Sequence, residues 1–242
     1  MDEKKIEKVI KIFEANDDEL NNLPYELALE IDNRSYCEYY ISLLRTKHAL
    51  IFTFWYKADY NSRILKIDLL FIIFASNYAV NALFFNDDTM YNIYQKEGEF
   101  DIEYELTKIC YTFLISTFLE MVVKKLALSN NDIISFKQDK NKNNVNKREN
   151  RLRKILAIKS IFYFIISSIF LLFFWYYISM FGAVYPNTQL YLLKDTLISY
   201  GGTLIKPFFI NLIPGFFRIP SLANGRKNRK FLYYLSRIIQ IF

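Results

Sequence analysis

The sequence predicts an all-α integral membrane protein, a helical bundle of about four transmembrane helices with amphipathic interfacial helices at both ends. The first reason is Ile161–Val184, a run of 24 residues without a charged side chain. In a helix that rises about 1.5 Å per residue, about 20 apolar residues cross the hydrocarbon core of a bilayer. A helix on the surface of a soluble protein would need a polar face, and this segment has none. The second reason is the alternation of basic and acidic residues between the apolar segments.

The overall composition agrees with a membrane protein. Hydrophobic residues make up 52% of the 242-residue chain and aromatic residues 18%, which is high for a soluble protein. The mean hydropathy is only +0.06 because strongly charged loops separate the apolar runs. The two cysteines, Cys37 and Cys110, suggest no disulfide framework. The first residues are charged and amphipathic and contain no signal peptide, so we expect the internal segments to direct insertion.

The N-terminal region, residues 1–63, is expected to be a cytosolic and juxtamembrane set of short helices. Apolar residues recur at helical spacing up to Phe13, a second helix follows Pro24, and Ser35 is a candidate cap for a third. The apolar stretch 49–56 is too short to span a bilayer, so we expect it at the interface or buried.

Four segments are predicted to span the membrane. The second is the weakest because it contains Glu120, and the fourth is expected to be broken or bent because it contains Gly201-Gly202, Pro207 and Pro214. The spans are Ile64–Phe85, Ile109–Val123, Ile161–Val184 and Leu197–Phe217. They group into two membrane regions, 64–128 with an acidic extracytoplasmic loop, and 161–217.

The charges of the loops predict the orientation of the spans. Residues 86–108 carry seven acidic side chains and two lysines, whereas residues 124–160 carry eleven Lys and Arg against three acids. The segment after the fourth span has six basic residues and no acid. By the positive-inside rule, both termini and the basic loop face the cytoplasm, and the acidic loop faces the opposite side.

Two further segments are predicted from composition. The basic cytoplasmic loop, residues 129–160, is expected to be disordered because its central part is rich in Asn and Lys and nearly free of apolar side chains. The tail, residues 218–242, is expected to contain an interfacial helix that binds the anionic cytoplasmic leaflet through its basic cluster. Its apolar face would hold Phe231, Leu232, Leu235, Ile238, Ile239 and Phe242.

Polar groups inside the predicted spans are the candidate site residues. A charged side chain at the centre of a bilayer costs about 2.5–3.5 kcal/mol on insertion scales, and it usually faces the bundle interior with a partner. We therefore expect Lys206 to pair with Glu120 or Asp68, and the nearby amides to hydrogen-bond across helices. The alternatives are a path for ions or protons and snorkelling of the charges to the interface. The candidate network is Asp68, Asn77, Asn81, Glu120 and Lys206.

Conventional enzyme signatures are missing from the sequence. His48 is the only histidine, which excludes a site built on two histidines, and no glycine-rich phosphate loop occurs. We expect no catalytic residue, no cofactor and no metal. The basic loop has no aromatic platform or fold motif for nucleic acid, so a solvated cytoplasmic loop is the better interpretation.

Several blocks of the sequence resemble a family of uncharacterised multi-pass membrane proteins from protists. The blocks are NALFFNDDTMYNIY (81–94), FGAVYPNTQLYLLKDTLISYG (181–201) and PGFFRIPSL (214–222). The resemblance implies a helical membrane module, often at the end of a longer protein, and it transfers no catalytic or binding residue.

Two functional classes follow from these observations. The first is a non-enzymatic membrane module, an anchor or assembly subunit whose partners are lipids and other membrane proteins or further copies of the chain. The second is a small oligomeric ion channel or transporter that uses the broken fourth span, since helices interrupted by Gly and Pro mark many transport sites.

Overall fold

The computed structural model describes residues 15–85, 87–95, 102–138, 145–186, 188–223 and 229–240. All regular secondary structure in these ranges is helical, which confirms the predicted all-α class. The chain divides into two compact units. Unit 1 combines Met1–Tyr60 with Leu204–Phe242, and unit 2 is Asn61–Thr203. Unit 1 thus contains most of the predicted N-terminal region and the whole of the predicted C-terminal tail.

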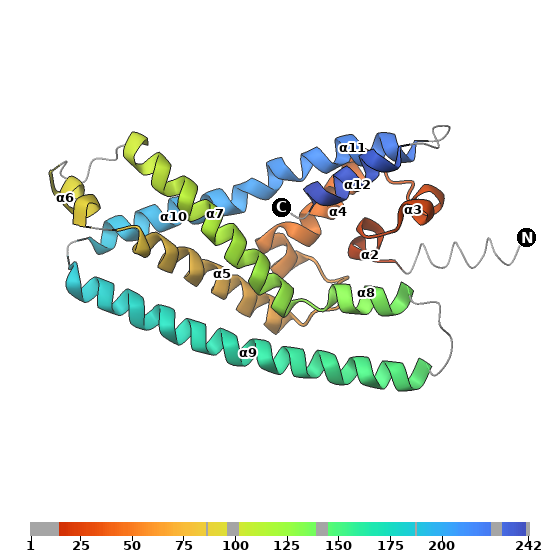
Figure 1. Ribbon diagram of the computed structural model, residues 1–242, viewed down its shortest axis with the longest axis horizontal. Helices are drawn as coiled ribbons and strands as arrows, with labels where there is room; N and C mark the ends of the chain where they lie inside the picture. The colour runs from red at the N-terminus through yellow and green to blue at the C-terminus, as the bar shows by residue number, and fades with distance from the viewer. Residues whose placement is uncertain are drawn as a thin grey trace, which may run out of the picture. The chain divides into compact units, whose positions relative to one another are not determined.

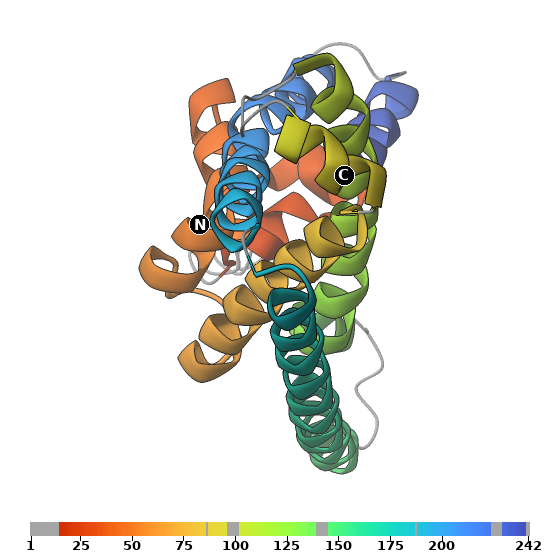
Figure 2. The ribbon, with the colours of Figure 1, turned by 90° about the vertical axis from the view of Figure 1, so that its left-hand side faces the viewer.

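Unit 2 is built around one central helix, α5, which packs against both α7 and α9 (Figures 1 and 2). The Ser62 hydroxyl caps α5 by accepting a hydrogen bond from the Leu65 amide at 3.2 Å. The helices of this unit are α5 (Arg63–Leu83), α6 (Asp87–Gln95), α7 (Ile102–Ala127), α8 (Asn130–Gln138), α9 (Val145–Val184) and the first part of α10 (Gln189–Ile210).

Two of the predicted spans agree closely with helices. The first span coincides with α5 within two residues at each end, and the third ends with α9 at Val184. α9 has 40 residues and is therefore much longer than its apolar part.

The prediction of disorder in the basic loop is wrong wherever the structure describes it. α8 occupies Asn130–Gln138, and α9 already begins at Val145; residues 139–144 lie outside the described ranges. Once the apolar helix is formed, extending it toward its N-terminus needs no new nucleus. The pair Glu149–Arg153 at 2.7 Å, one turn apart, further supports the extension. The Lys159 ammonium also contacts Asp132, at 2.7 Å.

Three helices in the described ranges are long and apolar enough to cross a membrane. They are Arg63–Leu83, Asn146–Val184 and the α10–α11 segment Gln189–Leu222. α7, which contains the predicted second span, is a helix of 26 residues but is not one of the three. The fourth crossing therefore stays a prediction.

The break in the predicted fourth span lies at Asn211, between α10 and α11 (Leu212–Leu222). Pro214 is the third residue of α11 and has no N–H to donate to the Ile210 carbonyl, so the helical hydrogen bonds stop there. By contrast, Pro207 and Gly201-Gly202 lie inside α10 without ending it.

Unit 1 begins with short helices that are capped by their own side chains. Asn16 with Glu19, and Ser35 with Glu38, form reciprocal capping boxes at the starts of two helices, which confirms Ser35 as a cap. The first helices are α2 (Asp17–Asn21), α3 (Tyr25–Ile31), α4 (Tyr36–Lys47) and the π-helix η1 (Ile51–Trp55). α12 (Lys230–Ile239) closes the unit by packing on α11.

Candidate functional site

The interior of unit 2 contains a buried ion pair. Lys108 on α7 lies 2.9 Å from the Asp195 carboxylate on α10, and their side chains are only 7% and 3% exposed. The Lys108 ammonium also stands 4.1 Å from the centre of the Phe85 ring, where the face of the ring attracts a cation. Breaking such a pair would leave a single charge in a medium of low dielectric constant, so the two groups depend on each other.

Buried polar side chains continue inward from this pair. Thr112 and Ser116 follow Lys108 on α7 at intervals of four residues, which places the three on one face of the helix. The hydroxyls of Thr112, Ser116 and Thr196 have no hydrogen-bond partner, and neither do Asn77 Oδ1 and Asn81 Nδ2. The ion pair and these side chains form what we call the polar band: Asn77, Asn81, Lys108, Thr112, Ser116, Asp195 and Thr196.

The register of α5 against α7 places these side chains opposite one another. Asn61, just before α5, accepts a hydrogen bond from the Ser129 amide, just after α7, at 2.9 Å. At the other end, Phe85 meets Lys108, so the two helices run antiparallel. Counting inward from these two contacts, Asn81 falls within about one helical turn of the level of Thr112. By the same count, Asn77 falls within about one turn of the level of Ser116.

An aromatic contact shows which part of α10 lies beside α5. The Tyr200 and Phe74 rings, from α10 and α5, lie 5.1 Å apart at a near-perpendicular angle. The Tyr200 hydroxyl interacts electrostatically with Glu120 on α7. Glu120 follows Ser116 by one four-residue step on α7, so it lies at the end of the polar band remote from the Lys108–Asp195 pair.

The five residues predicted from the sequence fall into both units. Asn77 and Asn81 lie in the polar band, 2% and 1% exposed. Glu120 pairs with Lys124 on its own helix at 2.5 Å, and Asp68 interacts with the Tyr163 hydroxyl of α9. Lys206 belongs to unit 1, so its pairing with Glu120 or Asp68 stays a prediction.

The asparagines also differ in detail from the expectation. The Asn77 amide donates to the Ile73 carbonyl of its own helix at 3.0 Å, and so this bond does not cross between helices. Sequence reasoning missed Lys108 and Asp195, which were counted as loop charges. The spacing in the sequence could have revealed Lys108, because it precedes Thr112 by four residues, as Thr112 precedes Ser116, and so lies on the same helix face.

Unit 1 contains a second buried charged cluster, centred on Arg218 of α11. Arg218 is fully buried and donates to the Asp32 carboxylate at 2.7 and 3.0 Å. It also donates to the backbone carbonyls of Leu20 and Asn21, at 2.8 and 3.2 Å. Its guanidinium lies 4.9 Å from the Tyr39 ring, on α4. Because each side of the guanidinium is engaged, we interpret this group as a structural connection and not as a binding site.

Asp32 is held by two arginines. Arg34 bonds both of its oxygens, at 2.7 and 3.0 Å, and also reaches Asn21 and Ser42. Burial alone would raise the pKa of Asp32, but hydrogen bonding and charge from Arg34 and Arg218 outweigh it, so the pKa lies below the ordinary value of 3.8. Asp32 is thus a carboxylate at neutral pH. Burial raises the pKa of Tyr39 to about 12, so that ring stays neutral.

Two tyrosines of α4 satisfy carbonyls at the α10–α11 break. The Tyr40 hydroxyl donates to the Phe208 carbonyl at 3.0 Å, and the Tyr36 hydroxyl donates to the Leu212 carbonyl at 2.8 Å. Gly215 allows this approach, because a Cβ atom there would lie 2.5 Å from the Tyr36 ring. The break is therefore held in place by the helix beside it.

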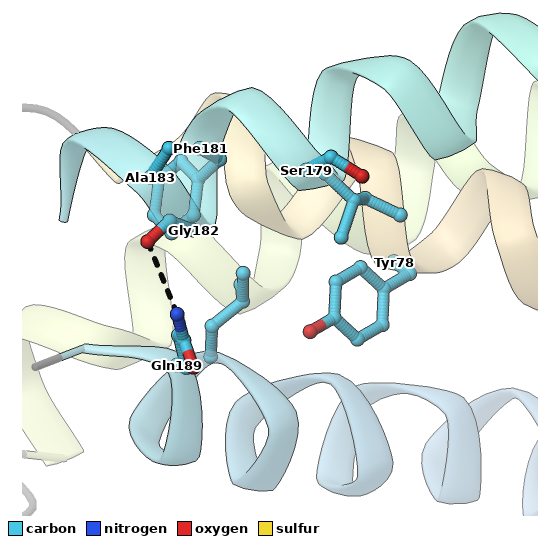
Figure 3. Close-up of a pocket in the computed structure, with 8 residues that line it drawn as sticks. Tyr78, Ser179, Phe181, Gly182, Ala183 and Gln189 are labelled. Carbon is cyan, nitrogen blue, oxygen red and sulfur yellow. Dashed lines mark hydrogen bonds between the residues drawn. The ribbon is translucent and has the colours of Figure 1, made fainter. Parts of the chain in front are cut away.

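Unit 2 also has a cavity of about 440 Å³ between α5, α9 and α10. Figure 3 shows Tyr78 extending between α9 and α10, and Gln189 donating to the Gly182 carbonyl at 3.0 Å. Most of its remaining lining is apolar, with Ile178, Phe181 and Leu192. The cavity lies on the face of α5 that carries Tyr78, and none of the residues that line it belongs to the polar band.

In the part of the chain that the structure describes, no group of three or more His, Cys, Asp or Glu side chains could hold a metal ion. No protein-family model matches the chain, and no curated protein or solved structure matches it either.

Proposed function

We propose that the chain is a non-enzymatic multi-pass membrane module, an anchor or assembly subunit whose partners are lipids and other membrane proteins. The observation that carries this proposal is the exposure of α9. Only 11% of its most apolar window is buried within the chain. Water is a poor environment for such a surface, whereas lipid tails or neighbouring helices would cover it.

The exposed residues of α9 lie on several sides of the helix. Leu172, Phe173 and Trp175 are 72%, 59% and 78% exposed, and successive residues of a helix point in directions about 100° apart. α9 therefore has only a narrow face against α5 and a wide face for lipid or a partner. This favours a module that offers a membrane surface over one that encloses a large active site.

The contacts of unit 1 support an even number of membrane crossings. The Tyr233 hydroxyl of α12 donates to the Leu23 carbonyl at 2.6 Å, and Lys230 pairs with Glu26 at 2.5 Å. If the apolar helices between them cross a membrane, the helices before α5 and after α11 would then lie on the same side of it. Three candidate spans give an odd number, and α7 as a fourth crossing would give an even number, in agreement with these contacts.

The C-terminal helix supports a lipid partner on that side. Phe231, Tyr234 and Ile238 are 76%, 51% and 55% exposed, and they recur at the three- and four-residue spacing of one helix face. Tyr233 and Ser236, on the opposite face, are fully buried in unit 1. With the basic side chains around it, the exposed face suits the anionic cytoplasmic leaflet.

A second candidate function, a small ion channel or transporter, is favoured by the polar band. A purely structural bundle would leave few hydrogen-bonding groups without partners in its apolar interior, because each costs several kcal/mol in hydrocarbon. The broken helix α10–α11 is a further feature shared with many transporters.

Two measurements test the main proposal. Reporter tags at positions 95 and 142 should report opposite sides of the membrane, and alkaline carbonate should leave the chain in the membrane pellet. Gentle solubilisation followed by pull-down should recover a stoichiometric membrane-protein partner or a defined oligomer. Tags on one side would contradict the topology, and a monomer without a partner would contradict the assembly role.

A further inference from the structure

We propose that the polar band of unit 2 holds a file of bound water that relays protons between Asp195 and Glu120. The proposal rests on the second candidate function and names its transported species. It is independent of the assembly role, because both the water and the relay lie inside a single chain.

Bound water follows from the chemistry of the five atoms without partners. Three are hydroxyls, which both donate and accept; one is a carbonyl oxygen and one an amide nitrogen. Their residues are at most 3% exposed, so bulk solvent does not satisfy them. Internal waters occupy such positions in proteins, typically with about three hydrogen bonds each to buried polar groups.

The spacing of these groups suits a continuous file. A four-residue step along a helix is about 6 Å, close to two hydrogen-bond lengths, so one water bridges each step on α7. Asn81 and Asn77 lie within about one helical turn of the levels of Thr112 and Ser116, so α5 supplies further partners along the file. From Lys108 to Glu120 the file would extend about 18 Å, more than half of a bilayer core of about 30 Å.

The two ends provide groups that exchange protons. Asp195 lies beside Lys108 at the outer end, and Glu120 lies beside Lys124 at the inner end. A proton bound by one carboxylate passes along the file as each water breaks one O–H bond and forms another. The other carboxylate releases it, so the chain itself is unchanged after each transfer.

The same arrangement favours protons over metal cations. A proton bonds covalently to a carboxylate oxygen, whereas Na⁺ or K⁺ would have to displace the ammonium group that already lies 2.9 Å from Asp195. The rest of the band is neutral, so it offers a metal ion no compensating charge.

The experiment compares proton entry into vesicles that contain the purified full-length chain, with an inside pH dye and a potassium diffusion potential as the driving force. The wild type should exceed empty vesicles, and Thr112→Val with Ser116→Ala should lower the excess at least tenfold. The matched control is Ser168→Ala, at an exposed position of α9, which should leave it unchanged.

Thermal unfolding of the same variants shows whether the buried hydroxyls of the polar band bind water. If the hydroxyls bind water, their replacement loses hydrogen bonds and lowers the Tm; if they are dry and unsatisfied, replacement raises the Tm. A raised Tm, no proton entry above empty vesicles, or entry unaffected by the double variant would each overturn the proposal. Conduction of Na⁺ or K⁺ in place of protons would also overturn it while leaving the transport candidate intact.

Discussion

Arg218 and Asp32 are 186 residues apart in the sequence, and the arginine donates two hydrogen bonds to a single carboxylate oxygen of the aspartate. Both side chains are almost fully buried, at 0% and 2% exposure. The pair connects the C-cap residue of α3 to α11. This contact and the arginine's bonds to Leu20 and Asn21 join the N-terminal helices of unit 1 to its C-terminal part.

Arg218→Met should destabilise unit 1 by about 3–5 kcal/mol, because it leaves the Asp32 carboxylate buried with one partner fewer. Chemical unfolding in detergent, followed by tryptophan and tyrosine fluorescence, measures the change. Arg153→Met is the matched control, since Arg153 is 76% exposed and its pair with Glu149 is worth less than about 1 kcal/mol. Equal losses in the two variants would contradict the role of Arg218.

The stability of unit 1 should fall at acidic pH in a way that depends on Asp32. Its pKa is lower in the folded chain than the ordinary value of 3.8, so its stabilisation is complete above that value. The contribution is lost as the pH falls through the folded pKa. Unfolding free energies measured from neutral to strongly acidic pH should decrease more steeply for the wild type than for Asp32→Asn. If the two variants show the same pH dependence of unfolding free energy, Asp32 has the same pKa in the folded and unfolded chain, which would contradict the prediction.

Gly215→Ala should destabilise the chain by about 1–3 kcal/mol, because the new methyl group would overlap the Tyr36 ring. Gly201→Ala is a matched control within the same polypeptide segment, since nothing lies within 4 Å of a Cβ atom there. That control should be neutral or stabilising by about 0.5–1 kcal/mol, through the better helix propensity of alanine. Thermal unfolding in detergent compares the two; similar shifts would argue against a close contact at Gly215.

Tyr36→Phe and Tyr40→Phe should each cost about 0.5–1.5 kcal/mol by removing the donor to a carbonyl at the helix break. Backbone hydrogen exchange around residues 208–212 should increase in both variants, whereas exchange in α5 should stay the same. No change near the break would mean that water replaces the two hydroxyls without loss.

Lys108→Met or Asp195→Leu alone should lower stability by about 3–5 kcal/mol, since each leaves one member of a buried ion pair without its counter-charge. Lys108→Met combined with Asp195→Leu should recover much of that loss, because a well-packed apolar pair avoids the desolvation of both ions. A double-mutant cycle on unfolding free energy gives the coupling. Additive losses would show that the two side chains act independently.

Local features of the fold could be predicted from the sequence. The apolar limit at Val184, the span now seen as α5 and the cap at Ser35 depend on residues that are neighbours in the chain. The helix from Val145 to Ser160 could not be predicted from its composition, because its polar sequence resembles that of disordered loops and its stability comes from the apolar helix that it extends.

The sites required long-range information. Asn77, Asn81 and Glu120 are visible because a polar side chain in an apolar run is conspicuous. Asp195 and Arg218 looked like ordinary loop or flanking charges, and only the pairing of distant segments buries them. A rule that assigns every charge near the end of a span to solvent will miss such residues.

Unit 1 combines an N-terminal and a C-terminal segment of the chain, and this sets the order in which its contacts form during synthesis. α2, α3 and α4 leave the ribosome long before α11 and α12, and until then Asp32 has Arg34 but not Arg218, while Leu23 has no Tyr233 hydroxyl. Closing a loop of this length is entropically costly, and contacts so distant in the sequence form late. The N-terminal helices must therefore wait until α5 to α10 have been made. A chaperone, a partner or the membrane surface has that interval in which to hold them.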